Sequence, residues 1–389
     1  MTRPARAVVD LHALRSNYLH ARAVHGGRVA AVMKANAYGH GAVRCALAIA
    51  DIVDAIAVAF TEEAVHLRLC GVKAPILVLE GAFEEGDLVT ASNYGLWMVV
   101  HHIEQVKMLE RCSRIHTPIA TWLKVDTGMH RAGVDPASVK AVWLRLKACA
   151  CVSSITLMTH LSSADEPARP TTHRQLKLFR ASTSGLECER SAANSAGLLT
   201  WEGARHEWAR TGLMIYGVHP LSHEAPGLLP VMSLSSQVFA ERWIARGESV
   251  GYGESFVAGR RTRVGLVAIG YADGYPRNAP TGTAVAINGR IARTIGRVSM
   301  DMLTVDLTDL PEAGVGCEVE LWGAQLPVHS VAAAAGTIPY ELLCNVKRVP
   351  FSYSEPDLPS DARADNDASA ASAALLPKVK QPNPVFIDS

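Results

Sequence analysis

The sequence VAAVMKANAYGHG, residues 29–41, contains the pattern that decides the fold: a short apolar run, a polar end and a glycine-bearing turn. Similar runs recur as far as about Gly217, and amphipathic stretches separate them. Continuous apolar runs are typical of parallel strands that helical crossovers bury on both faces. The predicted strands are Val29–Lys34, Ala55–Phe60, Pro75–Glu80, Leu96–Val100, Ala120–Asp126, Ile155–His160, Glu187–Ala192 and Glu207–Thr211.

Eight strand–helix units predict the α/β class and a closed (β/α)8 barrel of TIM type. An open doubly wound sheet is the alternative, because the last two units are weakly defined. We expect helices after Asp10 and after Asp135-Pro136, where an aspartate can cap the first turn. A further helix is expected from His101 to Arg111, with its apolar residues on one face.

After about residue 230 short alternating segments broken by glycines predict a mostly β domain. Asn288-Gly289 predicts a hairpin, since both positions of a tight two-residue turn favour positive φ. We therefore expect a barrel domain over residues 1–229, whose N-terminal segment is a candidate to pair with the β domain, and a β domain over residues 230–354. Residues 355–389, rich in Ala, Ser, Asp and Pro, are expected to be a disordered tail.

The composition excludes several classes of protein. The 389 residues carry 38 Lys and Arg against 37 Asp and Glu, which argues against a dedicated nucleic-acid binder. The start lacks the apolar run of a signal peptide, and no stretch approaches the roughly 18–20 apolar residues of a membrane helix. Eight scattered cysteines without a CxxC pair suggest neither a zinc site nor a disulfide framework. We expect a cytoplasmic protein without a metal, nucleic-acid or membrane partner.

Lys34 is the first candidate for chemistry. It ends the first predicted strand, and the carboxyl ends of barrel strands form the active face. A lysine amine there can react covalently with an aldehyde. Tyr38 adds a hydroxyl group, and Gly39 and Gly41 allow the backbone to approach a ligand closely.

The octapeptide KANAYGHG (34–41) resembles the lysine motif of alanine racemases, the fold-type III enzymes that depend on pyridoxal phosphate. The resemblance continues to about residue 354 through motifs in the same order. They are KVDTGMHRAG (124–133), MTH (158–160), ANSAG (193–197), ARTGLMIYG (209–217), VGYGESF (250–256), IGYADGYPR (269–277), GRVSMD (296–301) and PYELLC (339–344). In that family a barrel is followed by a β domain.

The resemblance implies a role for each matching residue. Lys34 would hold the cofactor covalently and act as the base on one face of the substrate. Racemisation needs a second acid/base group on the opposite face. Tyr252 matches that group, and in the family it comes from the other subunit of a homodimer. His160 and Arg210 would assist the phenol, and Arg210 would face the pyridine nitrogen of the cofactor.

Other matches concern binding. Tyr38, Ser195, Gly212, Leu213 and Tyr340 match positions that hold the cofactor phosphate. Arg131 matches the arginine beside the cofactor's phenolic oxygen, and Met300 matches the backbone contact to the substrate carboxylate. The substrate corridor corresponds to Tyr271, Arg277, Arg297, Ile338 and Asp165, and Lys124 matches a lysine that is carboxylated in some relatives. Asn36, Ala132 and Ser299 depart from common family residues, which affects only fine substrate preference.

We therefore expect an enzyme that interconverts L-alanine and D-alanine through pyridoxal phosphate, either to supply D-alanine for peptidoglycan or for alanine catabolism. One alternative is a racemase of broader range, acting on serine, lysine or arginine, or a related barrel decarboxylase. A second is a non-catalytic protein that binds pyridoxal phosphate. The β domain and Tyr252 argue against it, because single-barrel binding relatives lack a β domain.

Overall fold

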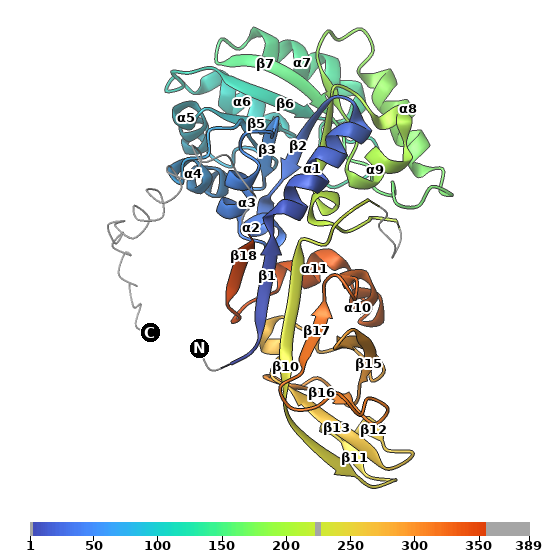
Figure 1. Ribbon diagram of the computed structural model, residues 1–389. Coiled ribbons are helices and arrows are strands. Elements are labelled where there is room, and N and C mark those ends of the chain that lie inside the picture. The colour runs from blue at the N-terminus through green and yellow to red at the C-terminus, as the bar shows by residue number, and fades with distance from the viewer. Residues whose placement is uncertain (1–2, 222–226, 355–389) are drawn as a thin grey trace, which may run out of the picture.

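The computed structural model describes residues 3–221 and 227–354. The segment expected to be a tail, residues 355–389, lies outside the described residues. Two lobes are visible, a barrel and a β-rich lobe joined by long strands (Figure 1). Within the described ranges, no helix is both long and apolar enough to cross a membrane.

The first lobe is a closed barrel of eight parallel strands in the order β2 to β9, which confirms the predicted (β/α)8 barrel and makes the open-sheet alternative wrong. Strands such as β3 and β4 are buried along their whole length, as their apolar sequences predict. The barrel strands are β2 (Arg28–Val32), β3 (Ala55–Val58), β4 (Ile76–Val78), β5 (Leu96–Val100), β6 (Ile119–Lys124), β7 (Val152–Met158), β8 (Arg190–Ser191) and β9 (Trp208–Thr211).

Helices surround this barrel. The side chain of Asp10 accepts hydrogen bonds from the N–H groups of His12 and Ala13, and Asp135 caps the turn that precedes α7, so both predicted caps are confirmed. The helical elements are α1 (Leu11–His25), α2 (Lys34–Tyr38), α3 (Ala42–Ala48), α4 (Thr61–Leu69), α5 (Glu85–Tyr94), α6 (Ile103–Arg111), η1 (Pro136–Ser138), α7 (Val139–Ala148), α8 (Thr171–Ser182), α9 (Ser195–Thr200), η2 (Glu202–Ala204) and η3 (Leu213–Tyr216).

The second lobe is built on an eight-stranded sheet in the order β13-β16-β15-β14-β17-β10-β1-β18, and a two-stranded ribbon joins β11 and β12. Asn288 and Gly289 have φ of 49° and 79° and connect β14 to β15, which confirms the predicted hairpin. The elements are β10 (Met232–Ile244), β11 (Ser249–Val250), η4 (Tyr252–Glu254), β12 (Phe256–Val257), β13 (Thr262–Val267), η5 (Tyr271–Asp273), β14 (Ala284–Ile287), β15 (Arg290–Thr294), β16 (Leu303–Asp306), β17 (Glu318–Trp322), α10 (Val328–Ala334), α11 (Pro339–Cys344) and β18 (Phe351–Ser354).

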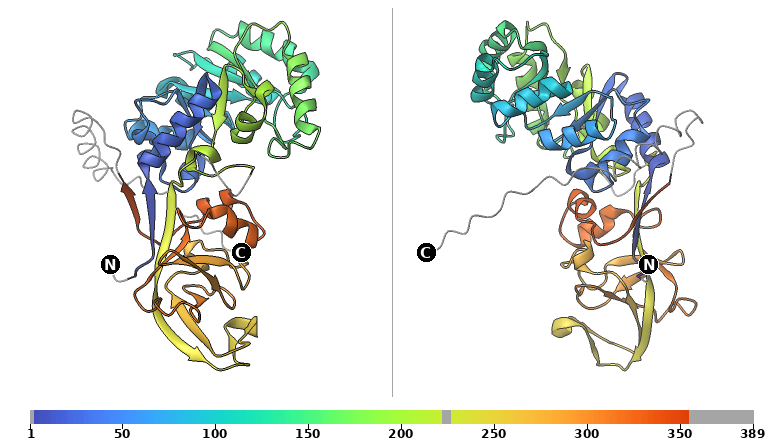
Figure 2. Two further views of the ribbon diagram at one scale, coloured as in Figure 1. Left: turned by 45° about the vertical axis from the view of Figure 1, so that its right-hand side comes forward. Right: turned by 90° about the vertical axis from the view of Figure 1, so that its left-hand side faces the viewer.

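Strands from both ends of the chain join the lobes. The strand β1 (Arg6–Asp10) pairs antiparallel with β10 and parallel with β18, so it belongs to the large sheet although α1 and the barrel follow it directly. Figure 2 shows β1, β10 and β18 running side by side between the lobes. Each lobe has its own hydrophobic core, and Phe351 packs against both. This arrangement holds α11 of the second lobe against α2 of the barrel.

Candidate active site

A cavity of about 460 Å³ lies at the carboxyl ends of the barrel strands and is closed on one side by α11. The structure brings together there nine of the expected catalytic, cofactor-binding and substrate-binding residues, and two other residues named in the sequence analysis, Lys124 and Ile338. The nine are Lys34, Tyr38, Arg131, His160, Ser195, Arg210, Gly212, Leu213 and Tyr340. Segments far apart in the sequence therefore converge on one place, where a small ligand can be enclosed.

Lys34 reaches this cavity from an unusual piece of backbone. The strand predicted to end at Lys34 ends two residues earlier, since β2 stops at Val32, and a left-handed turn of residues 35–38 follows Lys34. Ala35, Asn36, Ala37 and Tyr38 have φ between 51° and 55°. Side chains with a Cβ atom disfavour this conformation by about 1–2 kcal/mol per residue. Surrounding contacts must therefore hold the turn that carries Lys34.

Tyr38 and Ser195 place two hydroxyl donors beside Gly212 at one end of the cavity. The hydroxyl of Ser195 accepts hydrogen bonds from the N–H groups of Gly212 (3.1 Å) and Met214 (3.3 Å), so its own proton can be donated to a ligand. A Cβ atom added to Gly212 would lie 2.5 Å from the phenol oxygen of Tyr38. Burial raises the pKa of Tyr38, which keeps its phenol a donor at neutral pH.

Positive charge is in excess in the cavity. Lys34, Lys124, Arg131 and Arg210 line it, and among the residues that the structure describes Glu80 is the one lining carboxylate. Burial, opposed by the nearby Glu80 and assisted by the neighbouring cations, lowers the pKa of Lys124 to about 8. An anionic ligand would offset this uncompensated charge. The cationic lining and the donor group fit a small molecule that carries a phosphate.

Arg210 is fixed deep in the barrel. Its guanidinium group donates to the hydroxyl of Ser191 (2.5 Å) and to the carbonyl of Thr159 (2.7 Å). Burial lowers the pKa of Arg210 to about 10, so the group is still charged at neutral pH. Burial and the nearby Arg210 lower the pKa of His160 well below its usual range, which makes this imidazole neutral. The pair thus presents one permanent cation and one neutral ring.

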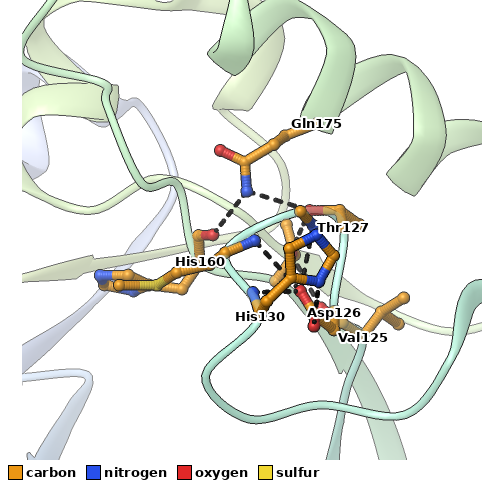
Figure 3. A network of polar contacts seen from close by, with 9 residues as sticks. Val125, Asp126, Thr127, His130, His160 and Gln175 are labelled. Carbon is orange, nitrogen blue, oxygen red and sulfur yellow. Dashed lines mark hydrogen bonds and ion pairs between the residues drawn. The ribbon is translucent and has the colours of Figure 1, made fainter.

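A polar network fixes the loop that carries Arg131 (Figure 3). The side chain of Gln175, on α8, donates to the carbonyl of His160 (3.0 Å) and to the hydroxyl of Thr127 (3.4 Å). One carboxylate oxygen of Asp126 accepts three backbone N–H groups of residues 128–130. These bonds tie the segment after β6 to the end of β7, so Arg131 and His160 are held in a fixed relation.

Tyr252 lies elsewhere in the same chain. The described residues that line the cavity do not include it. It begins the turn η4, between β11 and β12 in the second lobe, and its side chain is 68% exposed. The guanidinium group of Arg297 lies beside this turn, about 3.6 Å from the position of a Cβ on Gly253. One chain therefore does not place the phenol of Tyr252 beside Lys34.

Met300 also lies on a loop of the second lobe, and this residue is 53% exposed. The carbonyl groups of Ser299 and Met300 accept the N–H groups of Tyr271 and Ala272, each at 3.0 Å. Arg277 lies over the ring of Tyr271, 5.8 Å from its centre. The expected corridor residues of this lobe thus lie on one connected set of loops. The other two expected corridor residues belong elsewhere. Ile338 lines the barrel cavity, and the negative charge of Asp165 adds to the effect of burial in raising the pKa of Tyr340.

Sequence reasoning missed some residues of the cavity. Glu80 follows β4 and lines the cavity, and its place at the end of a predicted strand was a usable signal. Asn194 lines it too, and its side chain accepts the N–H of Gly197 at the start of α9. Cys344 comes from α11, whose position depends on packing between the lobes and has no local signal.

The fold and this cavity define a class: a barrel enzyme with a β domain, in which a lysine lies beside hydroxyl donors that fit a phosphate, the class that uses pyridoxal phosphate. The family model described as alanine racemase, N-terminal domain, matches residues 9–220, and the one for the C-terminal domain matches residues 231–353. The chain belongs to the alanine racemase family. It is therefore an isomerase that depends on pyridoxal phosphate and interconverts L-alanine and D-alanine.

Individual relatives agree. The chain is 55% identical to the alanine racemase of Azoarcus sp. (strain BH72) over 351 residues, which are 90% of this chain and 99% of that protein. It is 51% identical over 354 residues to a catabolic alanine racemase of Pseudomonas putida (strain KT2440), with coverage of 90% and 99%. The biosynthetic alanine racemase of Pseudomonas aeruginosa has a similar crystal structure, with a TM-score of 0.88, 47% identity and coverage of 91% and 100%.

An alanine racemase of Bartonella henselae, crystallised with covalently bound pyridoxal phosphate, superposes with a TM-score of 0.83 at 29% identity, covering 90% of this chain and 99% of that one. The expected family, enzyme class and cofactor are thus confirmed. The alternatives of a broader racemase or a non-catalytic binding protein are not favoured by these comparisons.

Proposed function

We propose that two copies of this chain form a homodimer in which the barrel cavity of one copy meets Tyr252 of the partner subunit. The observation that carries the proposal is the separation of two half-sites. Lys34 lines the cavity of the barrel, while Tyr252 lies exposed on the β lobe and does not line that cavity. Exchange of the α-hydrogen between the two faces of alanine needs one proton-transfer group on each face. Association of two copies supplies both.

Lys34 holds the cofactor covalently in this proposal, and it takes or returns the proton on one face. The bound pyridoxal phosphate supplies an electron sink that makes the α-hydrogen of alanine acidic. The hydroxyl groups of Tyr38, Ser195 and Tyr340 and the backbone of Gly212 and Leu213 hold its phosphate. The support is the convergence of these donors at one end of the cavity.

In this proposal Arg210 would face the ring nitrogen of the bound cofactor and would keep its own proton. An arginine with a pKa of about 10 donates a hydrogen bond but yields its proton poorly at neutral pH. Beside Arg210 a bound cofactor ring would withdraw less charge than beside a carboxylic acid, which would limit side reactions of the substrate. His160, which is neutral, would assist the phenol of Tyr252 without adding charge to the cavity.

Arg131 would hold the phenolic oxygen of the bound cofactor, and the backbone of Met300 of the partner subunit would bind the substrate carboxylate. Lys124 lines the same cavity as Arg131, and its pKa of about 8 leaves part of the amine neutral in mildly alkaline solution. The neutral amine can add carbon dioxide and release one proton, which creates a carbamate. This anion would hold Arg131 in place.

The corridor to the cavity consists of Tyr271, Arg277 and Arg297 of the partner subunit, with Ile338 and Asp165 of the barrel chain. Fixed arginines attract a small carboxylate substrate electrostatically. D-alanine made here would serve peptidoglycan or alanine catabolism, and relatives of both kinds, biosynthetic and catabolic, are among the proteins named above.

We divide the chain into a barrel domain of residues 1–229, whose N-terminal strand β1 pairs with strands of the β domain, and a β domain of residues 230–354. Support comes from the two family matches, which end at residue 220 and begin at residue 231. We place the enzyme in the cytoplasm, and the support is its eight free thiols.

Hybrid dimers test the shared site. Lys34→Ala and Tyr252→Phe chains are each expected to be nearly inactive as homodimers. After subunit exchange in equal amounts, half the dimers are hybrids with one intact site, so about a quarter of the wild-type activity should return. Two tags purified in sequence show that hybrids exist. Hybrids without activity would contradict the shared site.

A further inference from the structure

Three successive helices of the barrel, α4, α5 and α6, begin with the same hydrogen-bonding pattern. In each unit the third residue of the helix extends back and accepts the N–H groups of the loop before it, as in a capping box. The three residues are Glu63 of α4, Asp87 of α5 and Gln105 of α6. Their distances to the two N–H groups are 2.7 and 3.3 Å for Glu63, 2.8 and 3.2 Å for Asp87, and 2.8 and 3.3 Å for Gln105.

Two of these side chains also bind the preceding unit. The second carboxylate oxygen of Glu63 accepts the N–H of Ala35 at 2.7 Å. The amide of Gln105 donates to the carbonyl groups of Glu80 (3.3 Å) and Ala82 (3.1 Å). Asp87, one methylene shorter than Glu63, makes the cap through a single oxygen. Glu63 therefore does two things, and Asp87 shows what the cap alone requires.

The bridge from Glu63 ends at the most strained backbone of the cavity. Ala35 is the residue after Lys34 and the first of the four left-handed residues. A second cavity, of about 290 Å³, lies on this side of the turn and is lined by Met33, Asn36, Ala42, Val58, Glu62, Glu63, His66 and Leu67. Because this side is hollow, packing supports the turn poorly there, and the hydrogen bond from Ala35 carries more of the restraint.

The far end of the same turn is held differently. The ring of His40 stacks on Tyr216 with centres 4.5 Å apart, and its Nδ1 lies 2.9 Å from the carbonyl of Ala37. The side chain of Asn36 accepts the N–H of Ala42 at 2.8 Å. These contacts restrain the residues after Ala35. Glu63 acts at the junction between Lys34 and the turn.

We propose that Glu63 is a positioning residue for Lys34: its carboxylate bridges the start of α4 and the N–H of Ala35, and so fixes the direction in which the lysine side chain enters the cavity. The proposal rests on the function proposed above for Lys34. Glu63 itself lies outside the residues that line the main cavity.

The variant Glu63→Asp separates the two contacts. An aspartate is long enough to cap, as Asp87 shows in α5, but too short to cap and reach Ala35 as well. We expect Tm close to that of the wild type and exchange of the backbone hydrogens in peptide 33–40 accelerated about tenfold in the cofactor-free chain. The dissociation constant for pyridoxal phosphate should rise about tenfold, the effect of one hydrogen bond to a charged group.

Glu63→Ala and Asp87→Ala form the matched pair, because each removes one cap. Both should lower Tm to a similar extent, and only Glu63→Ala should weaken cofactor binding and lower kcat more than it raises KM. Unchanged exchange and cofactor affinity in Glu63→Asp would overturn the proposal, as would equal cofactor loss in Asp87→Ala. Failure of the role of Lys34 is distinguishable, since Lys34→Ala would then retain covalent cofactor while exchange at residues 33–40 still reports on Glu63.

Discussion

Replacement of Gly212 by alanine should displace the ring of Tyr38 at the end of the cavity where Tyr38 and Ser195 lie, by a distance that the structure defines. The new Cβ would lie 2.5 Å from the phenol oxygen of Tyr38 and 3.1 Å from its Cζ. An ordinary contact begins near 3.4 Å, so the ring must retreat by about 0.9 Å. Tyr216 and Tyr340 pack against that ring, with centres 5.0 and 5.5 Å away, and resist the movement.

We expect a loss of about 1–3 kcal/mol in the free energy of unfolding, the usual result of overpacking. At roughly 2–4 °C per kcal/mol, Tm should fall measurably. The affinity for pyridoxal phosphate should fall at least tenfold, because the hydroxyl of Tyr38 leaves its position. Differential scanning calorimetry measures the first quantity, and equilibrium dialysis measures the second.

Two controls make the test specific. Gly203→Ala places a Cβ no closer than 4.0 Å to a neighbouring atom and should leave both quantities unchanged. In a Tyr38→Phe background, Gly212→Ala should cost less stability, because the atom at 2.5 Å is gone, while cofactor affinity should stay low. Wild-type Tm and affinity in Gly212→Ala, or an equal penalty in both backgrounds, would refute this reasoning.

Three further predictions follow from other parts of the site. Lys34→Ala should abolish the visible absorbance of covalently held cofactor, whereas Tyr252→Phe should keep it and lose turnover in at least one direction; full racemisation by Tyr252→Phe would refute the assignment of two bases. Because burial lowers the pKa of Lys124 from 10.5 to about 8, the unfolded chain binds more protons between these pH values. The Tm of the cofactor-free chain should therefore contain a contribution that rises with pH from 8 to 10.5, and Lys124→Met should remove it. Gly270→Ala would place a Cβ 2.4 Å from the carbonyl of Met300 and should raise KM for alanine, with cofactor affinity unchanged; an unchanged KM would argue against the role of that loop.

Much of the fold was predictable because its signals are local. Asp10 and Asp135 cap their helices through their own side chains, and Asn288-Gly289 adopts the positive φ that its hairpin needs. The continuous apolar runs of the barrel predicted burial on both faces correctly. The strand β8, of only two residues, shows why the seventh unit was weakly defined.

The parts that sequence reasoning missed depend on tertiary contacts. Asn36 tolerates a left-handed conformation, but the alanines and the tyrosine of residues 35–38 disfavour it, so the residue types do not predict a turn of four such residues. Glu63 has the local signal of a helix cap, but its bond to Ala35 joins residues 28 positions apart. The exposed position of Tyr252 depends on the packing of the second lobe, so the sequence alone gave its chemistry and not its place.

The pairing of β1 has a consequence for biosynthesis. This strand is translated before the barrel, whereas its neighbours β10 and β18 are translated after the whole barrel. Until then its backbone N–H and C=O groups on both edges have no strand to bind, a state that invites pairing with other nascent chains. Chaperone dependence should therefore be greatest late in translation, after the barrel has already closed.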